Sequence, residues 1–277
     1  MFCYTMALGA CLGSFANVVI YRMPLGKSIV RPGSTCGSCH KPIRWRHNIP
    51  IFGWFLLRGR CGNCGAKYSV RYAMVELLMS FLFGIAWLRF GWSPTLIEAL
   101  IFIFSLVVCS FIDLDHMILP DKFTLSGIVI GLTGALLNPN RVFLDSVYGV
   151  LLGGGFLWAI AYFYLLIRKR EGMGGGDIKL LAWVGAVLGW KAVPFVILAA
   201  SLLGSVVGIA IALFTKRKSA DTSAGTSAEG SPEAQSEESD IPAFAIPFGP
   251  FLAAAALVYL LADGVGWTQW YLDLHGL

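Results

Sequence analysis

Long apolar runs separated by short polar segments dominate this chain of 277 residues. The runs fall at 2–21, 73–90, 95–112, 123–137, 142–167, 178–190, 192–214 and 243–262. A membrane-spanning helix needs about 20 mostly apolar residues, and most of these runs approach that length. The pattern therefore predicts an all-α polytopic membrane protein with about eight transmembrane helices.

Composition supports the membrane interpretation. Of all residues, 57% are hydrophobic and only 13% are charged, whereas about 25% are charged in an ordinary soluble domain. The mean hydropathy of +0.71 points the same way. So apolar a composition excludes a disordered chain and disfavours a soluble globule.

Basic residues gather in alternate connecting segments. If the N-terminus faces outward, the inside segments are 22–72, 113–122, 168–179 and 215–242, and they hold 18 of the 21 Lys and Arg residues. Because cytoplasmic loops carry an excess of Lys and Arg, these segments are predicted to face the cytoplasm. Anionic lipid head groups are sufficient partners for such a face, so nucleic acid is not an expected partner.

Two inside segments are longer than turns. Residues 22–72, between the first span (1–21) and spans two to seven (73–214), are long enough for a small folded module. Residues 215–242 are rich in Ser, Ala, Gly and Glu and cannot bury a core. They are predicted to form a disordered linker before the last span and C-terminal tail, 243–277.

Four of the seven cysteines form two C-x2-C pairs in the first inside loop. Cys36 pairs with Cys39, and Cys61 with Cys64, with 21 residues between the pairs. Four thiolates at this spacing suit a tetrahedral structural Zn²⁺ site with Zn–S bonds of about 2.3 Å. Two disulfides are the alternative, but the predicted cytoplasmic location disfavours them because that compartment is reducing.

Carboxylates cluster at the ends of two runs. Asp113, Asp115 and Asp121 follow the third run, and Asp177 follows a glycine-rich stretch before the sixth. Ionisable residues at a membrane boundary are costly and commonly functional. The predicted topology puts both clusters at cytoplasmic ends of spans, where they can meet. On composition alone, solvated helix ends and a flexible glycine turn remain the alternatives.

Paired aspartates predict aspartic protease chemistry. Two carboxylates in a partly desolvated site do not both ionise cheaply, so one keeps a proton. One Asp can then take a proton from water while the other polarises a carbonyl group. A proton-coupled membrane transporter using the same aspartates is the second interpretation. That interpretation requires mid-span aspartates and an internal repeat, and the sequence displays neither.

Several motifs together resemble the bacterial type IV prepilin peptidases, a leader peptidase/N-methyltransferase family within the G-x-G-D membrane aspartyl proteases. The matching segments are GSFANVVIYRMP at 13–24, the two C-x2-C pairs, RYAMVEL at 71–77, D-x6-P-D at 113–121, GMGGGDIK at 172–179 and IPFGPFL at 246–252. One departure is Ala73, which stands where the family usually has Pro.

The resemblance implies a pair of catalytic aspartates, Asp113 and Asp177. The supporting positions that it implies are Gly174, Gly176, Lys179 and Asp115. It also implies a multi-pass enzyme of the bacterial inner membrane that removes the leader of prepilins and pseudopilins at the cytoplasmic face. The enzyme would then methylate the new N-terminus with S-adenosylmethionine. No motif locates the binding site for that methyl donor, and none sets the oligomeric state.

Overall fold

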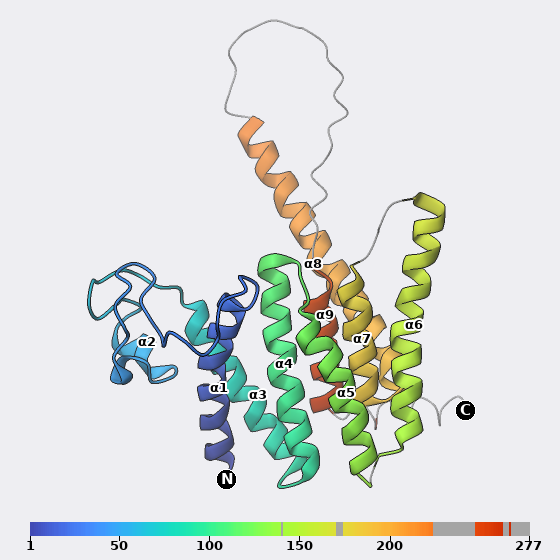
Figure 1. Ribbon diagram of the computed structural model, residues 1–277. Coiled ribbons are helices and arrows are strands. Elements are labelled where there is room, and N and C mark those ends of the chain that lie inside the picture. The colour runs from blue at the N-terminus through green and yellow to red at the C-terminus, as the bar shows by residue number, and fades with distance from the viewer. Residues whose placement is uncertain (140, 170–173, 224–246, 263–265, 267–277) are drawn as a thin grey trace, which may run out of the picture.

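The computed structural model describes all residues except 140, 170–173, 224–246, 263–265 and 267–277 (Figure 1). The described chain is helical and contains no strands, only two isolated β-bridges. Its elements are α1 (Phe2–Arg22), the 3-10 helix η1 (Trp45–His47), α2 (Phe52–Leu56), α3 (Arg71–Phe90), α4 (Pro94–His116), α5 (Asp121–Leu137), α6 (Phe143–Arg168), α7 (Gly175–Leu188), α8 (Ala192–Ser223) and α9 (Gly249–Leu261).

The eight predicted apolar runs correspond to α1 and α3 to α9, which confirms the all-α membrane fold. Five of these helices, α1, α3, α4, α6 and α8, are long and apolar enough to cross a membrane. The other three are shorter, with 17 residues in α5, 14 in α7 and 13 in α9. The protein is therefore a multi-pass membrane protein whose bundle combines full-length and short helices.

Helix α4 is the central element of the bundle (Figure 1). Ile103 and Val108, on one side of it, are buried against α1 and α3. On the other side, Phe102 packs edge-on against Trp183 of α7, with ring centroids 5.1 Å apart, within the core formed with α5, α8 and α9. This helix therefore joins the two apolar cores of the protein.

The end of α4 is fixed by local backbone chemistry. The helix begins at Ser93, whose side chain accepts a hydrogen bond from the N–H of Leu96, with Pro94 at the first helical position. It ends at Met117, which has a left-handed backbone (φ 53°). Pro120 then starts α5 because it is compatible with a helix N-terminus but not with a helix interior. The short 117–120 turn therefore separates the two helices.

Glycines allow α6 and α7 to approach closely. A Cβ added at Gly149 would collide with the backbone of Gly185, and one added at Gly153 would lie 2.5 Å from the carbonyl oxygen of Leu181. Small residues at such crossings let helix backbones pack without a side-chain layer, as is common in membrane proteins. This contact fixes α7, the helix that carries Asp177.

Two helix ends differ from the expected boundaries. Helix α8 continues to Ser223, past the expected start of the linker at 215. The extension, TKRKSADTS, lacks Gly and Pro, so nothing in it interrupts the helix. Helix α9 begins at Gly249, whereas the last apolar run begins at 243, because Pro247 and Pro250 favour a start there. The rest of the expected linker, 224–242, lies outside the described residues.

Candidate active site and metal centre

Asp113 lies in the last turn of α4 and is almost fully buried, with 5% of its surface exposed. Its Oδ2 atom has no hydrogen-bond partner among the described residues. The backbone of Gly249, at the start of α9, faces this atom so closely that an added Cβ would lie 2.5 Å from it. Because buried polar atoms without a partner are rare in folded proteins, this carboxyl group is a strong candidate for chemistry.

Asp177 lies in the first turn of α7 and is partly buried. Its carboxyl group is close enough to that of Asp113 for the two to interact electrostatically. The helix N-terminus also favours a negative charge at this position. The two aspartates that the sequence placed at the ends of separate spans therefore lie close enough in the folded protein to influence each other's charge.

Leu119 explains how these helix ends come together. This buried residue lies in the turn between α4 and α5. A Cβ added at Gly176 would be 2.8 Å from its Cβ, and one added at Gly249 would be 3.4 Å from its Cδ1. Leu119 therefore packs between the starts of α7 and α9, and Gly176 provides the space. Gly174 is the N-cap of α7, whereas Gly172 lies outside the described residues.

Four other charged residues on the helices that carry or adjoin the dyad form two ion pairs. Lys179 Nζ lies 2.6 Å from Asp121 Oδ1, which joins α7 to α5. Arg71 of α3 binds Asp115 of α4 with two contacts of 2.7 Å, and its guanidinium lies 4.9 Å from the ring centroid of Phe111. Asp115 is therefore engaged in an ion pair between helices, which distinguishes it from Asp113 two residues earlier.

The four cysteines of the C-x2-C pairs form one cluster. Their sulfur atoms all lie within 4.8 Å of one another, and Cys36 Sγ is 3.9 Å from Cys64 Sγ. In a tetrahedron with metal–sulfur bonds of about 2.3 Å, sulfur atoms lie about 3.8 Å apart. None of the four forms a disulfide. Cys36, Cys39, Cys61 and Cys64 are therefore arranged to hold a metal ion.

The same backbone turn presents both cysteine pairs. In the first, Cys36 N–H donates to Lys41 O (3.0 Å) and His40 N–H donates to Cys36 O (2.9 Å). In the second, Cys61 N–H donates to Ala66 O (2.8 Å) and Gly65 N–H donates to Cys61 O (2.9 Å). An isolated β-bridge closes each turn. The module thus contains two equivalent knuckles.

The pKa values of the clustered thiols are also consistent with a bound cation. Backbone N–H groups of Cys39 and Ser38 lower the pKa of Cys36 to about 6. At Cys64 a backbone hydrogen bond from Ala66 lowers the pKa, but desolvation and the neighbouring sulfurs outweigh it and raise the pKa to about 11. Four crowded thiols do not all ionise unless a positive ion compensates their charges.

Three residues of the sequence motifs, Asn17, Arg22 and Glu76, connect this module to the membrane helices. The guanidinium of Arg22, at the end of α1, donates to the carbonyl groups of Ser28, Pro32 and Gly33. The Asn17 amide donates to Tyr72 O (3.0 Å), and Glu76 of α3 accepts a hydrogen bond from Ile51 N–H (2.6 Å). The motifs containing Asn17, Arg22 and Glu76 were visible in the sequence, but these long-range contacts were not.

Comparison with known proteins agrees with this geometry. Aspartates paired at the ends of membrane helices are typical of membrane aspartyl proteases. Residues 7–90 match the bacterial peptidase A24 N-terminal domain, and residues 100–209 match the type IV leader peptidase family. The chain belongs to the type IV leader peptidase family. The first match contains all four clustered cysteines, and the second contains both aspartates.

Curated relatives share the name prepilin leader peptidase/N-methyltransferase. One from Myxococcus xanthus is 44% identical over 77% of this chain and 64% of its own length. One from Aeromonas salmonicida is 36% identical over 95% of this chain and 90% of its own length. One from Pseudomonas aeruginosa is 33% identical over 98% of this chain and 93% of its own length. No solved structure matches the chain, and no comparison supports the transporter interpretation.

Proposed function

We propose that this protein is a prepilin leader peptidase of the bacterial inner membrane that acts at its cytoplasmic face. In this proposal, Asp113 and Asp177 are the catalytic aspartates. The observation that carries the assignment is the buried Oδ2 of Asp113, which has no hydrogen-bond partner among the described residues and lies within electrostatic range of the Asp177 carboxyl group. The names of the relatives supply the substrate class, prepilins; pseudopilins are implied only by the motif resemblance.

The mechanism requires two carboxyl groups that carry one proton between them. The ionised aspartate takes a proton from water, whose oxygen attacks the carbonyl carbon of the scissile peptide bond. The protonated aspartate donates its proton to the carbonyl oxygen, giving a tetrahedral intermediate. Collapse of that intermediate breaks the C–N bond as the leaving amine receives the proton held by the first aspartate. A hydroxyl proton of the intermediate returns to the second aspartate as the carbonyl group re-forms, so the pair again carries one proton.

The relatives' names also support a second step, methylation of the new N-terminal amine. S-adenosylmethionine would supply the methyl group. This step requires only that the freed amine be held unprotonated near the donor, and we assign no residue to that binding site.

We further propose that the cysteine cluster holds one structural Zn²⁺ ion. Four sulfur ligands complete a tetrahedral shell and leave no position for a reacting water. The metal would therefore stabilise the 22–72 module, whose short helices offer little core of their own.

The function can be tested with purified full-length protein, a prepilin and isotopically labelled S-adenosylmethionine. Mass spectrometry should detect loss of the leader and transfer of label to the new N-terminus. An Asp113→Asn variant should do neither, whereas Asp115→Asn, the matched control two residues away, should retain measurable cleavage. Intact prepilin after incubation with the folded wild-type protein would contradict the peptidase assignment.

The zinc proposal has an independent test. Replacing Cys36 and Cys39 by Ser should release the metal and expose the module to proteolysis, while Cys11→Ser, outside the cluster, should do neither. Metal analysis of the intact protein should find about one zinc per chain. Oxidised cysteine pairs without metal, or a metal with three protein ligands and a water, would contradict a structural zinc site.

A further inference from the structure

Helix α2 presents an exposed apolar face within the cysteine module. Phe52, Phe55 and Leu56 are 72%, 61% and 73% exposed. Their spacing of three and four residues places them on one side of the helix. In the membrane helices such exposure is expected because lipid covers it, but α2 belongs to the segment that the charge pattern assigns to the cytoplasm. A contiguous apolar face at that location indicates an interaction surface.

The position of α2 points to the membrane as the partner. Ile51, the residue before α2, donates its N–H to Glu76, the sixth residue of α3. With a rise of 1.5 Å per residue, Glu76 lies about 7.5 Å along α3 from its first residue. Figure 1 shows α2 to the left of α1, below the level at which α4 ends. Helix α2 is therefore level with the cytoplasmic ends of membrane spans, not beyond them.

The charge of the module selects among possible partners. Residues 22–72 contain ten Lys and Arg residues and no Asp or Glu. Arg44, Arg58 and Arg60, close to α2 in sequence, are all exposed. Such a surface attracts anionic lipid head groups. It repels a second copy of itself.

We propose that the α2 face, defined by Phe52, Phe55 and Leu56, inserts into the cytoplasmic leaflet while the neighbouring arginines bind the phosphate groups of anionic phospholipids. Interfacial helices with apolar and basic sides bind membranes in this way. Because α1 and α3 already anchor both ends of the module, insertion of this short helix needs no large affinity of its own. The inference is independent of the proposed peptidase activity.

Site-specific photocrosslinking in the full-length protein can identify what covers this face. The photoreactive amino acid p-benzoylphenylalanine would replace Phe55 in protein reconstituted into vesicles of phosphatidylethanolamine and phosphatidylglycerol. The same group at Leu8, a 48% exposed residue of α1, is the control for lipid contact. At Asn63, an exposed polar residue of the second knuckle, it is the control for a position off the face. Zinc content would confirm that each variant is folded.

We expect the yield of lipid adducts at position 55 to be similar to the yield at position 8. It should exceed the yield at position 63 by at least about fivefold. Replacing phosphatidylglycerol by phosphatidylcholine should reduce the yield at position 55 more than at position 8. Equal yields at positions 55 and 63, or no lipid adduct at 55 while position 8 reacts, would overturn the proposal. Adducts at 55 to an added prepilin, or to a second copy of the chain, would overturn it in favour of that partner.

Discussion

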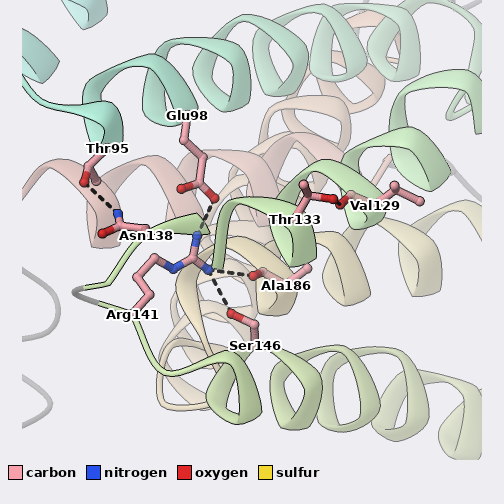
Figure 2. Close-up of polar contacts among 8 residues, drawn as sticks. All are labelled: Thr95, Glu98, Val129, Thr133, Asn138, Arg141, Ser146 and Ala186. Carbon is pink, nitrogen blue, oxygen red and sulfur yellow. Dashed lines mark hydrogen bonds and ion pairs between the residues drawn. The ribbon is translucent and has the colours of Figure 1, made fainter. Parts of the chain in front are cut away.

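Helix α4 carries a carboxyl group near each end that is shielded from solvent, Glu98 partly and Asp113 almost fully, and the two have opposite surroundings. At one end, Glu98 forms an ion pair with Arg141, which also donates to Ser146 Oγ (2.9 Å) and Ala186 O (2.8 Å), as Figure 2 shows. At the other end, Asp113 is buried with its Oδ2 unpartnered among the described residues. The first carboxyl group is neutralised and joins helices together, whereas the second remains available for chemistry.

A glycine lies against the carboxyl group at each end of α4. A Cβ added at Gly134 would lie 2.6 Å from Glu98 Oε1, and one added at Gly249 would lie 2.5 Å from Asp113 Oδ2. Backbone therefore approaches each carboxyl group closely, but among the described residues only the Glu98 end has a cation in contact with the acid. The difference between the stabilising carboxylate and the proposed catalytic one thus lies in the partner that the fold supplies, not in burial.

The largest effect on cleavage is expected from the aspartates. Asp113→Asn or Asp177→Asn should each reduce leader cleavage by about a thousandfold or more, because the two groups act as one unit. Thermal stability should change little, since neither carboxyl group contacts a cation among the described residues and the helix N-terminus favours the Asp177 charge only modestly. Mass spectrometry of the product and unfolding in detergent measure the two effects. Near-normal cleavage by Asp113→Asn with an inactive Asp115→Asn would reverse the assignment.

Gly249→Ala should reduce cleavage by about a hundredfold, because the new methyl group displaces the Asp113 carboxyl group by a fraction of an ångström to an ångström. Gly134→Ala provides the matched control, since it crowds Glu98 in the same way. We expect that control to lower thermal stability while leaving cleavage per folded molecule nearly unchanged. Equal losses of cleavage in the two variants would show that the comparison between the two ends is wrong.

Arg71→Lys should lower kcat by about tenfold with little change in KM, because lysine keeps the charge but loses the two-point contact with Asp115. The expected cause is a shift of the last turn of α4, which carries Asp113. Exchanging the pair, Arg71→Asp with Asp115→Arg, should restore part of the rate if the contact positions the helix. Additive losses in the exchanged protein would argue against coupling.

The smallest effect on cleavage is expected at the Glu98 end. Arg141→Met should lower the free energy of unfolding by about 2–3 kcal/mol, less than for a fully buried pair, since it leaves the largely shielded Glu98 without its cation. Replacing Glu98 by Met as well should recover much of that loss. Cleavage per folded molecule should change by no more than about twofold in either protein. A loss comparable to that of Asp113→Asn would mean that the ion pair takes part in the reaction.

Local patterns predicted much of this protein. The apolar runs predicted the helices of the bundle, five of which are long and apolar enough to cross a membrane, because a span must satisfy its backbone internally over about 20 apolar residues. The two C-x2-C pairs were enough to predict the cysteine cluster, because each pair forms its own knuckle within a few residues. The same patterns identified Asp113 and Asp177 as candidates, since costly carboxylates at span ends stand out in so apolar a sequence.

Only the tertiary structure decided which charged residues have partners. Arg71 and Asp115 are 44 residues apart, Glu98 and Arg141 are 43 apart, and Lys179 and Asp121 are 58 apart. Helical periodicity places a side chain on a face but does not say which helix packs against that face. Crossing geometry, set by glycines such as Gly149 and by side chains such as Leu119, makes that choice. It brought a cation to Glu98 and the backbone of Gly249 to Asp113.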